Sequence, residues 1–357
     1  MDDFLIIGGG IAGLSAGAHL SALGSVTLLE GEDALGYHTS GRSAALYEPT
    51  YGAPPVQALS EASGDYFFGV SNLLTPRGLL MVGMAGDSPA FEADAAAMRM
   101  ERLNIDEARA LVPVLDPNKV VMAGYHKEAW DIDTDRLLQI FARDIRTNGG
   151  QVLTSAQVST IHRTPAGWEV QCNNTSYSAR NLVNAAGAWA DQVAGLAGIA
   201  PIGITPYRRS MARVAAPEGV GVSHWPMLFG PGETWYAKPD AGALLVSPAD
   251  EVPVEPHDAW AEDMTLAEGI AKYEQYVTTP VTRMLANWAG LRSFAPDRSL
   301  VIGPDTRDPT FLWMAGQGGY GFQTSPAAGH LLAELANGRP PALAASAVTA
   351  LSPARFA

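Results

Sequence analysis

A glycine-rich turn near the start of the chain, GGGIAG at residues 8–13, constrains the fold more than any other feature of the sequence. It follows the apolar run 4–7, and apolar and small residues at helical spacing continue from it to residue 23. A second apolar run occupies residues 25–30. We therefore predict that this first segment forms a β-α-β unit, with the glycines at the junction of strand and helix.

Three of these glycines have the spacing of a dinucleotide-binding turn. Gly8, Gly10 and Gly13 form G-x-G-x-x-G, which lets the backbone turn tightly and approach a pyrophosphate at the N-terminus of the helix. Glu30 ends the second strand about twenty residues further on, where a carboxylate can accept hydrogen bonds from a ribose hydroxyl. On its own Glu30 would be interpreted as a solvated strand end. FAD and NAD both bind to such a unit, so these residues predict a dinucleotide without choosing between the two.

The middle of the chain changes from helical to extended patterns. Residues 106–115 and 133–150 are helical, and the second helix begins after an Asp/Thr cap and stops at two glycines. Strands are predicted between residues 151 and 183. From 205 to 290, aromatic and β-branched runs broken by Gly and Pro predict an antiparallel sheet, which a helix at 265–277 interrupts.

The end of the chain returns to the layout of its start. Residues 311–338 read as strand, glycine loop and helix, unlike the sheet before them. We infer that the first and last segments belong to one domain and that a substrate-side sheet is inserted between them. The Pro/Ala-rich tail, 339–357, is expected to pack on the protein or to have no role.

Composition excludes several classes of function. The 357 residues carry 23 Lys and Arg against 37 Asp and Glu, a net charge of −14, and contain no basic run. Binding to nucleic acid or anionic lipid therefore has no electrostatic basis, and a small-molecule partner is expected. The one cysteine, Cys172, provides neither a disulfide nor a thiolate metal cluster and is expected to be buried. The chain shows no signal-peptide pattern and no integral membrane segment, so we expect a cytoplasmic protein.

Seven motifs occur along the chain in the order expected of one enzyme superfamily. They are GGGIAGLSAGAHLSALG, LLE, GYHTSGRSAA, DIDTDRLL, LVNAAGAWAD, WAGLRSF and GQGGYGFQTS. On these motifs the chain resembles the FAD-dependent D-amino-acid oxidase and dehydrogenase (DAO) superfamily. Among its branches the chain is most similar to the bacterial FAD-dependent D-arginine dehydrogenases. The resemblance covers nearly the whole chain, from residue 4 to residue 356.

The resemblance implies an α/β fold with a Rossmann-like FAD-binding domain, discontinuous in sequence, and an inserted α+β substrate domain built on an antiparallel sheet. We expect the FAD-binding domain at 1–74, 146–204 and 296–357, and the substrate domain at 75–145 and 205–295. The implied reaction moves a hydride from the α-carbon of an amino acid to flavin N5, and the imino acid is hydrolysed to a 2-oxo acid and ammonia. The flavin supplies the redox chemistry, and the protein orients the substrate.

The resemblance also implies which residues hold FAD. The motif SGRS, with Arg42 and Ser43, is expected to meet the phosphates and the flavin ring. The similar dehydrogenases bind FAD noncovalently, so His38 is not expected to carry a covalent bond to it. The expected FAD-binding residues are Gly8, Gly10, Ile11, Ala12, Gly13, Glu30, Gly41, Arg42, Ser43, Ala44, Val158, Ala186, Gly187, Gly318, Tyr320, Gly321 and Gln323.

Arg292 and Arg209 fall on the carboxylate-binding positions of the superfamily. An arginine presents a planar fork that pairs with a carboxylate through two hydrogen bonds. The alternative for Arg292 is a structural salt bridge. For Arg209 the alternative is stronger, because Arg208 is adjacent and alternation along a strand points only one of the two inward.

Two tyrosines and one glycine complete the implied substrate site. Tyr51 and Tyr236 match positions that face the substrate, although either can also be a core tyrosine. Gly319 would let the backbone pass close to the flavin and offer a carbonyl to the substrate amine. Hydride loss needs a neutral amine, and no strong side-chain base is evident, so the amine is expected to lose its proton through water.

Three positions depart from the arginine-specific relatives. Leu79 stands where those relatives carry an acid that meets the guanidinium, and Leu46 stands where they carry a histidine. A cationic side chain buried beside two leucines would lack a countercharge, so we predict a preference for neutral, apolar D-amino acids. Glu48 replaces a neutral hydroxyl and can attract a basic side chain or the substrate ammonium. Its alternative is a solvated loop acid.

Other functions stay open at this point. The same scaffold and arginine clamp would serve a secondary-amine oxidase that acts on glycine or N-methylated amino acids such as sarcosine. A noncatalytic flavin-binding protein also fits, because motifs report cofactor binding better than turnover. An NAD-dependent dehydrogenase would explain the glycine turn but neither SGRS nor GQGGYG. The electron acceptor, whether O2, a quinone or another carrier, cannot be read from the sequence.

Overall fold

The first β-α-β unit forms the centre of a mixed sheet in the computed structural model, which describes residues 1–357. Strand β1 (Asp2–Ile7) leads through the glycine turn into α1 (Ile11–Leu20), and β2 (Val26–Leu29) pairs parallel with β1. On its other side β1 pairs parallel with β12 (Thr175–Asn184), which pairs parallel with β20 (Phe311–Ala315). The predicted unit is confirmed, with its helix ending three residues earlier than expected.

This first sheet has eight strands, and the two ends of the chain meet in it. Strand β9 (Gln151–Leu153) extends it beyond β2. The outer strands are β10 (Val158–Thr164), β11 (Gly167–Cys172) and β19 (Val301–Pro304). Cys172 is free and buried, as expected. The C-terminal strand and helix therefore join the N-terminal unit, as the repeated layout predicted.

Helices α6 and α9 pack against α1 on one face of this sheet. Helix α9 spans Gly321–Ala336, and α6 spans Thr134–Thr147 after the cap at Asp133, whose side chain accepts the N–H of Arg136. The predicted domain boundary between residues 145 and 146 falls inside α6. Because Leu137, Phe141 and other apolar residues of α6 share one core with α1 and α9, the whole helix belongs with the first sheet.

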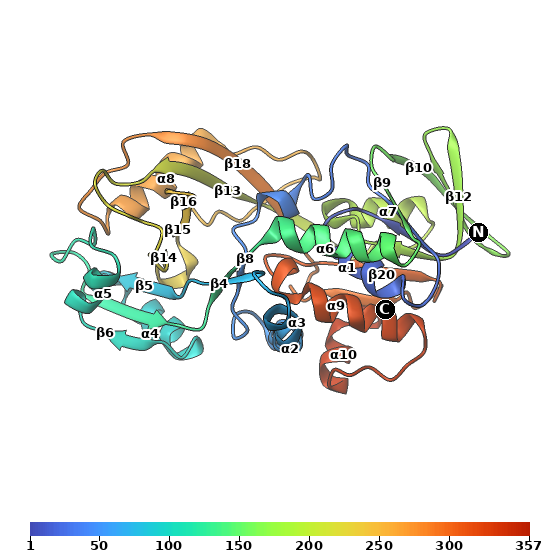
Figure 1. Cartoon of the computed structure of the whole chain (residues 1–357), viewed down its shortest axis with the longest axis horizontal. Coiled ribbons are helices and arrows are strands. Elements are labelled where there is room, and N and C mark those ends of the chain that lie inside the picture. The colour runs from blue at the N-terminus through green and yellow to red at the C-terminus, as the bar shows by residue number, and fades with distance from the viewer.

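A nine-stranded sheet forms the second lobe, at the opposite end of the molecule (Figure 1). Every pairing in it is antiparallel except that of β14 with β5. Helix α8 (Asp263–Glu274) lies against two of its strands, close to the predicted helix. The strands are β5 (Leu79–Gly83), β6 (Glu101–Leu103), β7 (Met122–His126), β13 (Thr205–Ala215), β14 (Met227–Phe229), β15 (Tyr236–Asp240), β16 (Ala243–Ser247), β17 (Val252–Pro253) and β18 (Met284–Phe294).

A small three-stranded sheet lies where the chain crosses between the lobes (Figure 1). It consists of β3 (Leu46–Tyr47), β8 (Trp130–Ile132) and β4 (Leu74–Pro76). Its first strand carries the end of the SGRSAALY segment out of the first lobe. The other helices are α2 (Pro54–Ala62), α3 (Gly64–Gly69), α4 (Ser88–Ala97), α5 (Ile105–Leu111), α7 (Ala190–Leu196) and α10 (Ala345–Leu351). Leu351 of α10 is fully buried in the core around α1, so the Pro/Ala-rich tail packs on the protein.

Candidate cofactor and substrate site

The glycine turn has the close approaches that its spacing predicts. Gly8 has a φ of +110°, a backbone conformation that side chains other than glycine rarely adopt. A Cβ on Gly13 would lie 1.9 Å from the carbonyl oxygen of Gly8, so any larger residue there would push the helix off the strand. The turn therefore leaves the N-terminus of α1 open, with Gly10 as its N-cap. Such a terminus attracts negative charge.

Three adjoining cavities run from this turn into the second lobe. The first, of about 320 Å³, is lined by Gly8, Glu30 and Val158 among others, and the second, of about 150 Å³, lies over the start of α1. The third, of about 320 Å³, lies under the nine-stranded sheet. Neighbouring cavities share lining residues, so the three form one elongated trough. FAD bound in this trough would place its pyrophosphate at the open N-terminus of α1 and its adenosine end beside Glu30 in the first cavity.

Most of the expected FAD-binding residues line the first two cavities. Of the seventeen, only three do not: Gly13, Gly41 and Tyr320. Gly13 acts through the turn itself. The N–H of Gly41 donates to the carbonyl of Gly36 at 2.6 Å, and the ring of Tyr320 lies against those of Tyr51 and Phe294, so the observed contacts of these two residues are with the protein. Other lining residues were not among those expected: Glu32 and Gln157 lie outside the motifs, whereas Tyr37, Thr39, Trp189 and Gln317 lie within them.

Glu30 lies at the wall of the first cavity, and both of its oxygens already accept main-chain hydrogen bonds. Oε2 accepts the N–H of Gly9 at 2.6 Å, and Oε1 accepts the N–H of Glu32 at 2.9 Å. The carboxylate thus holds the glycine turn and the following loop together. Its remaining lone pairs face a cavity where a ribose would lie. The solvated strand end is not what the structure shows.

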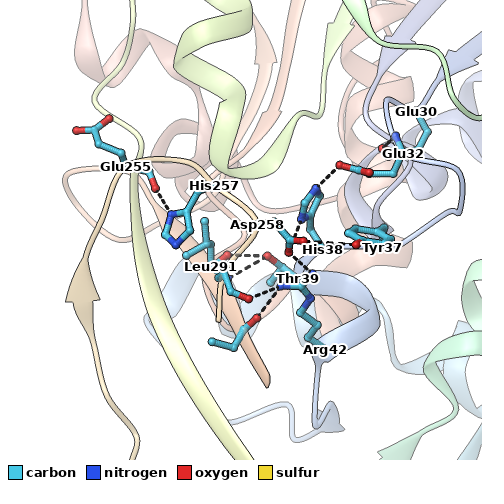
Figure 2. Close-up of polar contacts among 12 residues, drawn as sticks. Glu30, Glu32, Tyr37, His38, Thr39, Arg42, Glu255, His257, Asp258 and Leu291 are labelled. Atoms are coloured by element: carbon cyan, nitrogen blue, oxygen red, sulfur yellow. Dashed lines mark hydrogen bonds and ion pairs between the residues drawn. The ribbon is translucent and has the colours of Figure 1, made fainter. Parts of the chain in front are cut away.

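The guanidinium of Arg42 is bound by protein groups, so it is not free to bind the phosphates as the SGRS motif led us to expect (Figure 2). Its Nη1 donates to the carbonyls of Ala259 and Ala289, each at 2.9 Å, and Nη2 pairs with Asp258 at 2.5 Å. The guanidinium holds the pKa of the Asp258 carboxyl below its ordinary value. Arg42 therefore ties the FAD-side turn to a loop of the second lobe, and only the rest of the residue faces the second cavity.

His38 is held by acids on both sides of its ring (Figure 2). Nε2 lies 2.9 Å from Glu32, and Nδ1 lies 3.8 Å from Asp258. The ring also packs on Trp189, with 4.6 Å between centroids. Both nitrogens are directed at carboxylates rather than left free for a bond to carbon, which agrees with noncovalent FAD binding.

Arg209 and Arg292 lie on one face of the paired strands β13 and β18. Arg209 stands opposite Gly290 and Tyr207 opposite Arg292, so the two arginines are diagonal neighbours, and both line the second and third cavities. Arg208 points to the other face, where it pairs with Glu262 and Asp250. The predicted alternation therefore places Arg209, not Arg208, at the cavity.

Arg292 has no hydrogen bond and no ion pair with any protein group, so the structural salt bridge proposed as its alternative is absent. Burial opposes its charged form, but the phenols of Tyr236 and Tyr51 and the carboxylate of Glu233 outweigh this, and the pKa of Arg292 lies above its ordinary value. A Cβ on Gly319 would lie 2.9 Å from its Cζ, so only glycine leaves room for the guanidinium there. Arg209, in contrast, donates to the carbonyl of Asp250 at 2.8 Å and lies 3.6 Å from Glu251.

Tyr51 and Tyr236 both line the third cavity. Tyr236 is buried, and Tyr51 donates its hydroxyl hydrogen bond to Glu233 at 2.5 Å. Burial, followed by the charge of Glu233, raises the pKa of Tyr51 well above its ordinary value, so the phenol stays protonated. Glu233 has a φ of +51° and follows Gly232 at +69°, so both residues have left-handed backbone, and no sequence motif indicated Glu233.

Leu46, Leu79 and Glu48 lie in the wall of the third cavity. Glu48 is 2% exposed, so its interpretation as a solvated loop acid is wrong. Its Oε1 accepts the N–H and the hydroxyl of Thr50 at 3.1 and 2.6 Å and lies 3.3 Å from Nε2 of His126. The sequence could not show this burial, because it depends on β7 bringing His126 across from β5.

Comparisons with known proteins agree on the architecture. A family model described as DAO, FAD dependent oxidoreductase, matches residues 3–335. FAD-dependent oxidoreductase domain-containing protein 1 of Bos taurus is 23% identical over 93% of this chain and 80% of its own length. N-methyl-L-tryptophan oxidase of Yersinia pestis is 22% identical over 99% of both chains. The crystal structure of glycine oxidase from Geobacillus kaustophilus superposes with a TM-score of 0.83 at 20% identity, covering 98% of each chain.

Two of these names state different compounds, N-methyl-L-tryptophan and glycine, and the third states none, so the comparisons establish the family and the fold but not the substrate. No group of three or more His, Cys, Asp or Glu side chains is arranged to hold a metal ion. None of the helices has the length and apolar character needed to cross a membrane.

Proposed function

Because the chain belongs to the DAO family of FAD-dependent oxidoreductases, we propose that it oxidatively deaminates D-amino acids to 2-oxo acids and ammonia. Arg292 carries the proposal. It is a cation at the boundary of the flavin and substrate cavities that has no protein anion as partner. An unpaired arginine in a cavity indicates an anionic ligand, and a substrate carboxylate matches its fork through two hydrogen bonds.

The residues around Arg292 are arranged to hold an amino acid by its polar end. Arg292 and the hydroxyl of Tyr236 would bind the carboxylate, with Arg209 beside them on the same strand face. The carbonyl of Gly319 would accept a hydrogen bond from the amine. These contacts fix the α-carbon at the junction of the second and third cavities. FAD bound in the trough would accept the hydride from that carbon.

Loss of the amine proton is the second requirement. The lining of the third cavity contains neither histidine nor lysine, and the hydroxyl of Tyr51 stays protonated. Glu48, Asp94 and Glu233 also line this cavity, but none of them belongs to the set proposed to hold the amine. The ammonium proton is therefore proposed to leave to water before hydride transfer. The buried walls formed by Leu46, Leu79 and Phe229 would then exclude further water from the reacting carbon.

An anaerobic titration of the FAD-loaded protein with amino acids of both hands tests the proposal. We expect D-amino acids to bleach the flavin absorbance and their L-enantiomers to leave it oxidised. Bleaching by L-amino acids alone, or by none of either hand, would refute the assignment. Reoxidation by O2 compared with a soluble quinone then identifies the electron acceptor.

A second candidate is oxidation of glycine or of a secondary amine such as sarcosine. It is favoured by the close similarity in fold to glycine oxidase and by N-methyl-L-tryptophan oxidase among the relatives. The same arginine would bind the carboxylate of these compounds. Sarcosine, glycine and proline in the same titration separate the two candidates. Glycine would fill little of the 320 Å³ cavity, so a D-amino-acid oxidising enzyme should be reduced faster by substrates with a larger side chain.

A further inference from the structure

Three residues that line the third cavity have a buried polar atom without a partner: Glu48, Gln323 and Trp235. The first two are neighbours, and they are 2% and 5% exposed. Oε2 of Glu48 receives no hydrogen bond, and Nε2 of Gln323 donates none. Neither atom is open to solvent, so each side chain must turn toward the cavity to meet a ligand. Because a buried polar atom without a partner is costly, a ligand group that satisfies both atoms would favour that turn.

The remaining atoms of the two side chains show which ends are free. Oε1 of Gln323 accepts the backbone N–H of Glu48 at 3.3 Å, which directs the amide NH2 away from that backbone. Oε1 of Glu48 is occupied by Thr50 and lies beside His126. The free carboxylate oxygen and the free NH2 therefore belong to neighbouring residues of one wall.

We propose that Glu48 and Gln323 form a subsite for a primary carboxamide at the end of the substrate side chain. The carboxamide NH2 would donate to Oε2 of Glu48, and its carbonyl would accept from Nε2 of Gln323. The proposal rests on D-amino-acid oxidation and names the side-chain class, that of D-asparagine and D-glutamine. A neutral carboxamide also agrees with the apolar surfaces of Leu46 and Leu79.

Other side-chain groups satisfy only half of this pair. An ammonium or guanidinium group would donate to Glu48 but present a second donor to the NH2 of Gln323. A carboxylate would accept from Gln323 but meet the charge of Glu48. An alkyl group would leave both atoms unpaired, and a site built to bond a polar group rejects such an analogue strongly.

Steady-state kinetics with substrates of equal shape test the subsite. D-asparagine, D-leucine and D-aspartate differ in the terminal group and hardly in volume, and D-lysine supplies the cationic case. We expect kcat/KM for D-asparagine to exceed that for D-leucine by about 10- to 100-fold, with D-aspartate lowest. Equal values for D-asparagine and D-leucine, or a preference for D-lysine, would overturn the subsite.

Variants of Glu48 separate the side-chain subsite from other roles. Glu48→Leu should bring the ratio of D-asparagine to D-leucine close to one, and Glu48→Gln should improve D-aspartate relative to the parent enzyme. Glu61→Gln, an exposed acid on α2, is the matched control and should change neither ratio. A uniform loss with every substrate in both Glu48 variants would place this acid at the α-amine and refute the proposal.

Gln323 also borders the flavin cavity, so its variant needs a second readout. We expect Gln323→Met to lower the D-asparagine to D-leucine ratio with little change in FAD affinity. A weaker FAD affinity with an unchanged ratio would assign Gln323 to the cofactor and overturn the carboxamide pair. If D-leucine bleaches the flavin as fast as D-asparagine, the subsite falls while the proposed reaction stands. If no amino acid bleaches it, both fall.

Discussion

Replacing Arg292 by methionine should abolish substrate binding without weakening the fold. The guanidinium has no ion pair and no hydrogen bond to lose, and Tyr236, Tyr51 and Glu233 offset the cost of burying its charge, so the free energy of unfolding should change little. Truncating one partner of a buried, hydrogen-bonded charge pair costs about 2–5 kcal/mol, which here means a fall in kcat/KM of about 30- to 4,000-fold. Arg292→Lys keeps the positive charge but loses the planar fork of the guanidinium, so its kcat/KM should lie between those of the parent enzyme and Arg292→Met.

Arg208 provides the control, because it lies next to Tyr207, the strand partner of Arg292, but points to the other face of the same pair of strands. It is 7% exposed, pairs with Glu262 and lies 3.6 Å from Asp250. Arg208→Met should therefore destabilise the protein, because the buried carboxylate of Asp250 would lose the cation beside it. Its kcat/KM should change little. Denaturant unfolding and anaerobic flavin reduction measure the two quantities. If Arg292→Met unfolds as easily as Arg208→Met, or retains more than a tenth of its kcat/KM, the assignment of Arg292 to the substrate is refuted.

Three further perturbations follow from the structure. Asp258→Asn removes the charge partner of Arg42 and should weaken FAD binding several-fold in a fluorescence titration, whereas an unchanged affinity would show that this tie between the lobes does not support the cofactor turn. Tyr51→Phe removes the hydroxyl that donates to Glu233 and should raise KM by about tenfold, as expected for a charge-assisted hydrogen bond worth about 1.5–3 kcal/mol; an unchanged KM would contradict this. Burial, with the nearby His330, lowers the pKa of His19 to about 4, so the unfolded chain binds this proton first and stability should fall by about 3 kcal/mol as the pH drops from 6.5 to 4. His19→Gln should remove that part of the pH dependence in urea titrations, and a slope identical to the parent's would exclude His19 as its source.

The cofactor half of the site was predictable because it is local in sequence. Gly8, Gly13 and Glu30 lie within one β-α-β unit, and the strand, turn and helix that place them are encoded by neighbouring residues. Backbone geometry fixes their positions, so spacing alone is informative. Arg42 is the exception within this half. Its guanidinium donates hydrogen bonds to Asp258 and Ala259, which lie more than two hundred residues further along the chain, and no local pattern predicts those contacts.

The substrate half depends on which side chains from separate segments face one another. Strand alternation predicted that only one of Arg208 and Arg209 points inward, because that requires only the pleat of β13, and the resemblance to the superfamily indicated Arg209. The burial of Glu48 could not be predicted from the sequence around it. A short loop acid is usually solvated, yet this one lies under β7 with His126 beside it and Gln323 bonded to its backbone. Burial changes the substrate that Glu48 predicts. If its carboxylate were solvated, Leu46 and Leu79 would favour apolar substrates. Because it is buried and has a free oxygen, a substrate with a hydrogen-bond donor is favoured instead. The proposed preference for substrate side chains therefore depends on the tertiary contact of Glu48 with Gln323. The ratio of kcat/KM for D-asparagine to that for D-leucine tests the role of this contact.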